Sequence, residues 1–254
     1  MLYPSGVRQD GAADELDDPR RIQALRALIR GKPALRRYYE EVYAKYAECL
    51  RRCPADGVAL ELGAGPSFVK ASLPEVTTSD VLAYEGVDAV VDATRMPFAD
   101  RSLRAILMMN VFHHIPDVAA FLGEASRCLK HGGRVFMVDQ HVNWFSRIIY
   151  RHAHHEPFEP DAEDWSFAST GPLSGANGAL ATIVFERDRE RFEHRYPELR
   201  LERFQPHTPF RYFMAGGLKS WTLLPGWGFS LAKRLEEKLL PGVGCFVDIE
   251  LVRG

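Results

Sequence analysis

The chain has 254 residues, of which 46% are hydrophobic and 26% charged, a composition typical of one large globular domain. The formal net charge of −2 provides no general basic surface and argues against a nucleic acid as partner. The longest apolar stretch, residues 105–112, is too short to span a bilayer, and residues 1–18 are polar and acidic rather than a secretory signal. We therefore expect a cytoplasmic protein without a membrane span. Four scattered cysteines predict no disulfide framework.

The first 56 residues predict a helical N-terminal arm. Residues 1–17 have the composition of a flexible start. A helix is expected from Asp18-Pro19, an N-cap acid followed by proline, to Gly31. A second helix is expected from Pro33 to just before Pro54, because its apolar residues recur every three to four positions.

Residues 57–141 alternate between strand and helix patterns, which predicts a parallel sheet built from right-handed crossovers. The expected strands are residues 58–62, 76–79 with Asp80 at the end, 87–91, 103–110 and 134–138. A short helix is expected directly after the first strand. Another helix is expected from the cap Asp117 to about Lys130, stopped by Gly132-Gly133.

Residues 142–254 are less regular and are expected to hold a lid, a substrate-side insert and the last strands. The patterns predict helices at 143–153, 179–195 and 231–240, and strands at 199–204 and 245–252. The loop between residues 156 and 178 has the length and composition of a lid or a mobile surface loop. The aromatic residues of segment 207–243 are compatible with an apolar or sugar-stacking pocket, and equally with a satellite core.

The segment from Leu60 to Ser67 places two glycines directly after the first strand. Gly63 and Gly65 allow a tight turn and a close approach of the backbone to a ligand. Asp80 closes the second strand, where a carboxylate can accept both hydroxyls of a ribose. A dinucleotide fingerprint would require a third glycine at position 68, where Phe68 stands. A nicotinamide or flavin dinucleotide is therefore disfavoured.

Five motifs in order make residues 58–139 resemble the class I S-adenosylmethionine-dependent methyltransferases, in the branch that contains ubiquinone-biosynthesis-like small-molecule enzymes. The motifs are Glu61-x-Gly63-x-Gly65, Thr78-Ser79-Asp80, Asp92-Ala93 with Pro97-Phe98, Asn110 to Asp117, and Leu129-Lys-His-Gly132-Gly133. The sequence departs from the family's pattern at Pro66, Ser67 and His131. The resemblance implies a Rossmann-like α/β fold over residues 1–254 as a single domain, with a mostly parallel seven-stranded sheet and an antiparallel last strand.

The resemblance also implies S-adenosylmethionine as cofactor, S-adenosylhomocysteine as its product, and no metal. The implied cofactor-binding residues are Glu61, Gly63, Ala64, Gly65, Asp80, Val81, Asp92, Ala93, Asn110 and Val111. By the family's pattern the glycines and Glu61 approach the methionine end, Asp80 holds the ribose, and Asp92 with Ala93 contacts the adenine. Asn110 and Val111 would line the methionine and sulfonium region.

Three histidines are candidates for a general base, which typically contributes about 10²–10⁴-fold to a rate. His113 and His114 follow the fourth predicted strand and His141 follows the fifth, at the edge of the sheet where ligands bind. The alternative is that they pack and bond to the backbone. The cluster His152, His154, His155 and Glu156 lacks the spacing of a known zinc site, so we expect lid or acceptor contacts there rather than a metal.

The expected function is methyl transfer from S-adenosylmethionine to a small-molecule or glycan-type acceptor, with oxygen as the favoured accepting atom. Methylation at nitrogen or carbon of a natural product is the alternative within enzymes. A non-catalytic S-adenosylmethionine-binding regulatory homologue is the alternative outside them. The sequence leaves the acceptor and the oligomeric state open.

Overall fold

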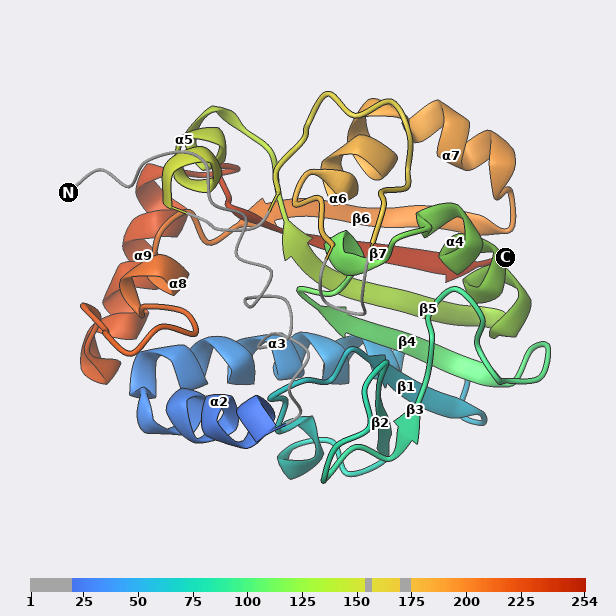
Figure 1. Cartoon of the computed structure of the whole chain (residues 1–254), viewed down its shortest axis with the longest axis horizontal. Helices are drawn as coiled ribbons and strands as arrows, with labels where there is room; N and C mark the ends of the chain where they lie inside the picture. Colours follow the sequence, from blue (N-terminus) through green and yellow to red (C-terminus); the bar gives the residue numbers. More distant parts are fainter. Residues whose placement is uncertain (1–19, 154–156, 170–174) are drawn as a thin grey trace.

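The structure is a computed structural model that describes residues 20–153, 157–169 and 175–254. The described residues form one seven-stranded sheet in the order β3-β2-β1-β4-β5-β7-β6 (Figure 1). Its strands are β1 Val58–Leu62, β2 Val76–Asp80, β3 Ala89–Val90, β4 Leu103–Met109, β5 Leu129–Gln140, β6 Leu199–His207 and β7 Phe246–Arg253. Only β7 runs antiparallel to its neighbours. The expected sheet is therefore confirmed, whereas the flexible start at 1–17 lies outside the described residues.

The helices lie on both faces of the sheet. They are α2 Arg20–Gly31, α3 Pro33–Arg51, α4 Val118–Cys128, α5 Trp144–Ala153, α6 Leu180–Thr182, α7 Arg189–Arg195, α8 Arg211–Met214 and α9 Phe229–Leu239. Short 3-10 turns occupy Val69–Ala71, Phe112–His114 and Gly226–Gly228, and a π-helical segment occupies Ile183–Arg187. In the part of the chain that the structure describes, no helix is long and apolar enough to cross a membrane.

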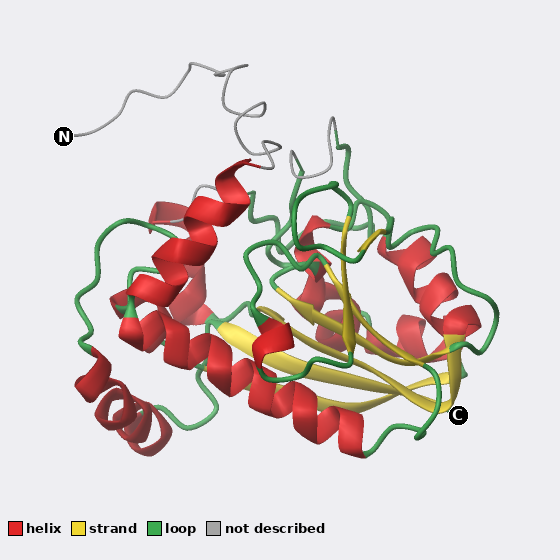
Figure 2. Cartoon of the chain, turned by 90° about the horizontal axis from the view of Figure 1, so that it is seen from below, coloured by secondary structure: helices red, strands yellow, loops and turns green. Residues whose placement is uncertain are grey.

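Alternate strand residues face two separate cores, as the period of two in a strand requires. Leu60, Ile106 and Met137 pack on the side of α4, α6 and the π-helical segment. Ala105, Phe136 and their neighbours pack on the side of α3, α5, α8 and α9. Figure 2 shows the long helix α3 lying along its face of the sheet. The expected helical arm is thus confirmed, and it serves as one of the two covering layers.

The helix expected directly after β1 is absent from the described structure. Residues 63–75 form a turn and the single 3-10 turn Val69–Ala71. The link is short and contains Pro66 and Pro74, which remove backbone donors from a helix. The arm covers this face instead, with the Tyr46 ring 5.9 Å from that of Phe136. The glycine loop therefore has no helix N-terminus behind it.

Other element boundaries also differ from expectation, since β5 covers Leu129–Gln140 instead of 134–138 and β6 continues to His207 instead of ending at 204. The helix expected to reach Lys130 ends at Cys128, because Leu129 is already extended and pairs with Leu103 of β4. The third strand is only Ala89–Val90. The helix expected over 179–195 is divided into α6, the π-helical segment and α7, where Asp188 leaves helical geometry and accepts a hydrogen bond from the Trp165 indole (2.8 Å).

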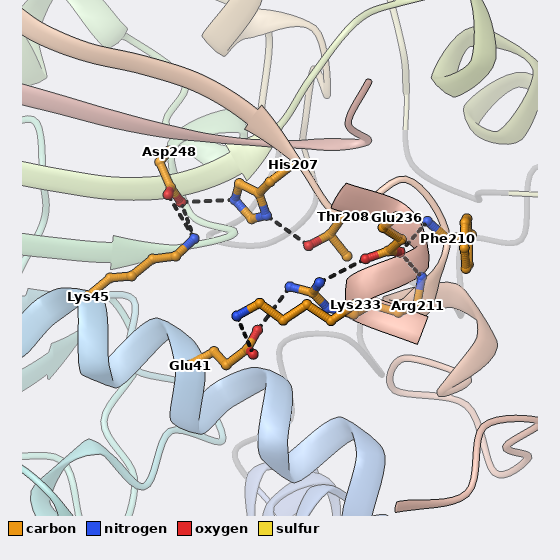
Figure 3. A network of polar contacts seen from close by, with 9 residues as sticks. All are labelled: Glu41, Lys45, His207, Thr208, Phe210, Arg211, Lys233, Glu236 and Asp248. Carbon is orange, nitrogen blue, oxygen red and sulfur yellow. Dashed lines mark hydrogen bonds and ion pairs between the residues drawn. The ribbon is translucent and has the colours of Figure 1, made fainter. Parts of the chain in front are cut away.

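The segment 208–245 forms a cap that charged side chains tie to α3, and α3 is tied in turn to β7 (Figure 3). The Arg211 guanidinium lies 2.9 Å from Glu41 of α3 and 2.8 Å from Glu236 of α9. Lys45 of α3 lies 2.7 Å from Asp248 of β7. Burial acts to raise the pKa of Asp248, but the neighbouring His207 and Lys45 lower it to about 2. These ion pairs fix the cap to the sheet.

Replacing Arg211 with leucine is expected to destabilise the protein strongly. The change leaves the buried carboxylate of Glu236 without its cation, and breaking a buried pair costs about 3–5 kcal/mol. For a chain of this size the melting temperature should fall by roughly 6–20 °C, measured by thermal unfolding. The control is Arg234→Gln on α9, the helix that carries Glu236. Arg234 is exposed and has no ion-pair partner among the described residues, and a drop equal to that of Arg211→Leu would contradict this explanation.

Candidate cofactor and acceptor site

The glycine loop after β1 has a backbone that requires glycine at two positions. Gly63 has φ 63° and Gly65 has φ 48°, both in the left-handed region that side chains disfavour. At Gly63 a Cβ would also lie 2.4 Å from a methyl carbon of Val111. Val111 follows β4, so the structure brings these two predicted residues into contact across the neighbouring strands.

Replacing Gly63 with alanine should cost more than the left-handed backbone alone. The left-handed conformation costs about 1–2 kcal/mol, and overpacking against Val111 adds about 1–3 kcal/mol. Chemical unfolding should therefore show a loss of roughly 2–5 kcal/mol. The matched control is Gly242→Ala, since Gly242 has φ 75° but nothing within 4 Å of the position that a Cβ would take. Equal losses in the two variants would contradict the contact with Val111.

The loop satisfies its own backbone donors. The N–H of Ala64 donates to Ser79 O (2.8 Å), and that of Gly65 to Asp80 Oδ2 (2.9 Å). The N–H of Phe68 donates to the Tyr43 hydroxyl (3.1 Å), and its ring lies 5.0 Å from that of Tyr43. These amides are therefore not directed at a phosphate, in agreement with the argument against a dinucleotide.

Glu61 lies behind the loop as a buried carboxyl group. Its Oε1 accepts a hydrogen bond from Ser67 Oγ (3.1 Å), whereas Oε2 is buried and has no hydrogen-bond partner among the described residues. Burial is the main cause that raises the pKa of Glu61 to about 8; the hydrogen bond from Ser67 opposes this shift, and the negative charge of Asp80 adds to it. A cationic donor placed at Oε2 would remove this cost of burial.

Asp80 stands at the end of β2 with both oxygens already bonded. Oδ2 accepts from Gly65 N and from the Tyr84 hydroxyl (3.1 Å), and Oδ1 accepts from Leu82 N (3.2 Å). The Tyr84 hydroxyl also lies 3.2 Å from Gly65 O. Each carboxylate oxygen can accept more than one hydrogen bond, so Asp80 keeps acceptor capacity beside the loop.

The residues predicted for the adenine side lie at the surface. Asp92 is exposed and its Oδ1 accepts from the Thr94 amide (2.8 Å) and hydroxyl (2.7 Å). Ala93 is half-buried against the core. Val81 is 39% exposed. A group bound between Asp80 and Asp92 would thus meet one partly buried and one exposed carboxylate.

Asn110 marks the end of β4 with an unusual backbone. Its φ is 55°, a conformation that asparagine tolerates better than most residues, and its N–H donates to Val138 O (2.8 Å). Its side-chain Oδ1 is buried and has no hydrogen-bond partner among the described residues. Two such acceptor oxygens, from Glu61 and Asn110, therefore stand at the ends of the neighbouring strands β1 and β4.

His113 is held by a buried carboxylate. Its Nδ1 lies 2.7 Å from Asp139 Oδ1, and both side chains are at most 1% exposed. Asp139 also accepts from the N–H groups of Phe112 (2.9 Å) and Gln140 (2.7 Å), which keeps it oriented. His113 Nε2 lies 3.3 Å from Gln140 Nε2. With Nδ1–H donating to Asp139, Nε2 carries the lone pair that a general base needs.

The other two candidate histidines have different surroundings. The His114 ring stacks on His113 with 4.2 Å between centroids, and its Nδ1 lies 3.1 Å from Gly175 O. His141 has contacts with other elements: its Nδ1 lies 3.0 Å from Gly244 O and its Nε2 3.5 Å from Glu186 Oε2. The structure thus brings His113 and His114 together and links His141 to the start of β7 and the π-helical segment.

Several residues at the site were not predicted. Asp139 could have been found, because it directly follows the apolar run of residues 134–138 that predicts the fifth strand. Tyr43 and Tyr84 could not, since aromatic residues at helical or loop positions do not differ in sequence from core residues. The motif His154 to Glu156 and the side chain of His152 lie outside the described residues. Among the residues described, no three or more His, Cys, Asp or Glu side chains gather as metal ligands would.

Comparison with known proteins agrees with this geometry. A methyltransferase-domain family pattern matches residues 60–137. A ubiquinone/menaquinone biosynthesis C-methyltransferase of Desulfotalea psychrophila is 36% identical over 58 residues, which is 22% of this chain and 24% of that protein. The matched segment thus spans about a quarter of that relative's length.

Two solved structures share the fold at low sequence identity. One is the complex between the Haloferax volcanii Trm112 methyltransferase activator and a methyltransferase, with a TM-score of 0.51 and 14% identity, covering 98% of this chain and 99% of that one. The other is geranyl diphosphate C-methyltransferase from Streptomyces coelicolor A3(2), with a TM-score of 0.52 and 15% identity, covering 87% of this chain and 82% of that one. The chain therefore has the Rossmann-like fold of the class I methyltransferases, and its residues 60–137 match the methyltransferase-domain family.

Proposed function

We propose that this protein is a cytoplasmic enzyme that transfers a methyl group from S-adenosylmethionine to the oxygen of a small-molecule or sugar acceptor. The observation that carries the cofactor assignment is the pair of buried acceptor oxygens, at Glu61 and Asn110, that have no partner among the described residues. They lie beside a glycine loop that lets the backbone come close to a ligand. Both oxygens suit a donor such as the ammonium group of the methionine moiety. The residues present therefore fit this cofactor.

The residues around the loop would hold the cofactor in parts. Glu61 and Asn110 would bind the methionine end, together with the backbone of Gly63, Ala64 and Gly65 and the side chain of Val111. Asp80 and Val81 would hold the ribose, and Asp92 with Ala93 the adenine. S-adenosylmethionine supplies a methyl group already activated on a sulfonium. The task left to the protein is to position the acceptor, which can contribute about 7–11 kcal/mol, and to remove its proton.

His113 is the residue we assign to proton removal. A hydroxyl acceptor benefits from a base, and Asp139 orients the His113 ring and stabilises the charge that it would gain. His114 and His141 remain alternatives that substitution can separate. Methylation at carbon or nitrogen is the competing reaction, and both the ubiquinone/menaquinone relative and the geranyl diphosphate enzyme are named as C-methyltransferases. A regulatory homologue without turnover is the alternative outside enzymes.

The raised pKa of Glu61 predicts a pH dependence. The folded protein keeps the proton up to about pH 8, whereas the unfolded chain loses it near the ordinary value of about 4.3. The contribution of Glu61 to stability is therefore full below pH 4.3 and is lost as pH rises towards 8, by up to about 5 kcal/mol. Glu61→Gln should flatten this part of the stability–pH curve, measured by chemical unfolding at several pH values. An unchanged slope in the variant would contradict the burial of a neutral carboxyl group.

The same group should link cofactor binding to proton release. An ammonium at Oε2 favours the ionised form of Glu61, so binding at pH 7 releases a proton and tightens as pH rises to about 8. Calorimetry in buffers of different ionisation enthalpy measures this proton directly, and Glu61→Gln should abolish it. Screening hydroxyl, amine and carbon acceptors with product analysis by mass spectrometry and nuclear magnetic resonance then tests the acceptor. Methyl transfer only to carbon would overturn the assignment to oxygen and leave the cofactor assignment intact.

A further inference from the structure

Helix α9 presents apolar residues to solvent instead of to the core. Its inward face consists of Phe229, Ala232 and Glu236, which are buried. The exposed apolar residues Leu231, Leu235 and Leu239 follow one another at intervals of four, so they share the outward face of α9, and the exposed Trp227 lies in the 3-10 turn directly before the helix. The preceding loop adds Leu218, Trp221 and Leu223. We call these seven residues the α9 apolar surface.

The exposure of this surface is large for a monomeric protein. Trp227 is 81% exposed, Leu223 72% and Leu239 66%. Four of the six aromatic residues in the cap, Phe210, Tyr212, Phe213 and Phe229, pack against the core, as the alternative of a core role for this segment expects. Trp221 and Trp227 instead point to the outside. A contiguous exposed apolar patch normally marks an interaction site.

The charges around the α9 apolar surface favour an anionic partner. Lys219, Arg234 and Lys238 are exposed and have no ion-pair partner among the described residues. Glu237 is the exposed acid of the helix, while Glu236 is buried against Arg211. Tryptophan and leucine on one face with lysine and arginine beside them is the composition of helices that lie in the interface of a membrane.

A second copy of the chain is a poorer occupant of this surface. In a twofold interface this patch would face a copy of itself, so the three cations Lys219, Arg234 and Lys238 would face the same three cations of the partner. Such like charges repel, whereas the negative surface of an anionic bilayer attracts all three. We therefore propose that the α9 apolar surface docks the protein onto the surface of an anionic lipid bilayer, with α9 parallel to the membrane plane.

The position of the surface relates this docking to the site. The cap begins where β6 ends. Because β6 runs parallel to β4 and β5, all three strands end at the same edge of the sheet, and the cap therefore starts at the edge that carries His113 and Gln140. Helix α5 follows β5 at the same edge and exposes Trp144 and Ile148, again four residues apart. Figure 1 shows α5, α8 and α9 gathered at one end of the molecule. Docking there would bring the site close to acceptors held in or at the bilayer.

Vesicle flotation of the full chain tests the docking without any need for turnover. Wild-type protein should float with vesicles of phosphatidylcholine containing about 30% phosphatidylglycerol, and much less with phosphatidylcholine alone. High salt should weaken the binding. The double variant Leu231→Ser with Leu235→Ser should lose it, and Arg234→Gln with Lys238→Gln should reduce partitioning about 30-fold. All four positions are exposed, so these variants are expected to fold.

Control variants remove the same kinds of side chain, an exposed apolar residue or two exposed cations, at positions outside the α9 apolar surface. Val90→Ser changes an exposed apolar residue of β3, and Arg189→Gln with Arg200→Gln removes two exposed cations of α7 and β6. These variants should float like wild type. Absence of flotation with either vesicle would overturn the proposal, as would binding that the α9 variants leave unchanged. So would a dimer in sedimentation that the Leu231→Ser, Leu235→Ser variant dissociates, because it would assign the surface to a second copy.

Discussion

The His113→Ala variant is expected to lose methyl transfer by about 10²–10⁴-fold in kcat while binding S-adenosylmethionine with unchanged affinity. The reason is that Asp139 holds Nδ1 at 2.7 Å and orients the ring, so that Nε2, which lies 3.3 Å from the Gln140 amide nitrogen, is the atom that would take the proton of the acceptor. Single-turnover kinetics with a hydroxyl acceptor measures the chemical step, and calorimetry measures the cofactor affinity. A loss in kcat with unchanged affinity separates proton removal from cofactor binding.

His114→Ala is the matched control, because His114 lies in the same turn and bonds to a backbone carbonyl instead of a carboxylate. Its turnover should stay close to that of wild type. His113→Gln provides a second test with a polar side chain in place of the ring, in case the alanine variant folds poorly. Full turnover in either folded His113 variant would exclude this residue as the base and favour His141 or positioning alone.

The Asp80→Ala variant is expected to raise the Kd for S-adenosylmethionine roughly 10²-fold or more. Hydrogen bonds to a charged group contribute about 1.5–3 kcal/mol each, and the proposed ribose contact has two of them. Asp80 also fixes the loop through Gly65 N, so its loss should loosen the glycine loop. Calorimetric titration measures the affinity, and thermal unfolding checks that the variant is folded.

The Tyr84→Phe variant separates two roles of Asp80: its proposed contact with the ribose and its hydrogen bond with the Tyr84 hydroxyl. The Tyr84 hydroxyl donates to Asp80 Oδ2, so its removal frees an acceptor site without removing the charge. Cofactor affinity should be unchanged or tighter in this variant. A folded Asp80→Ala variant that binds as well as wild type would remove Asp80 from the site.

The elements of the core could be predicted from local patterns in the sequence. β4 and β5 are continuous apolar runs, and α4 begins at Asp117, whose side chain accepts from Ala120 N as an N-cap should. The secondary-structure predictions that were wrong concern features that depend on distant parts of the chain. The link between β1 and β2, which contains Pro66 and Pro74, is compatible in sequence with a short helix. That no helix is needed there becomes clear only once α3 is seen to cover this face of the sheet. The break at Asp188 depends on a hydrogen bond from Trp165, a residue 23 positions away.

The features of the candidate site likewise fall into those that could be predicted from the sequence and those that could not. The sequence placed Glu61, Asp80 and Asn110 at strand ends, and neighbouring parallel strands necessarily bring these ends together. It could not reveal that Glu61 Oε2 and Asn110 Oδ1 are buried without partners among the described residues, because burial is a property of the packed chain. Nor could it show that Tyr84 bonds to Asp80. The carboxylate that holds His113 could have been predicted, since Asp139 directly follows the apolar run of residues 134–138.

Calorimetric titration with S-adenosylmethionine, S-adenosylhomocysteine and NADH tests the central claim most directly. The proposal predicts micromolar binding of the first two, because Glu61 Oε2 and Asn110 Oδ1 are buried acceptors without partners among the described residues and Asp80 keeps acceptor capacity beside the loop. It predicts no binding of NADH, since the loop amides are bonded within the protein and Phe68 replaces the glycine of a dinucleotide site. Binding of NADH, or no binding of S-adenosylmethionine by folded protein free of copurified cofactor, would contradict the assignment.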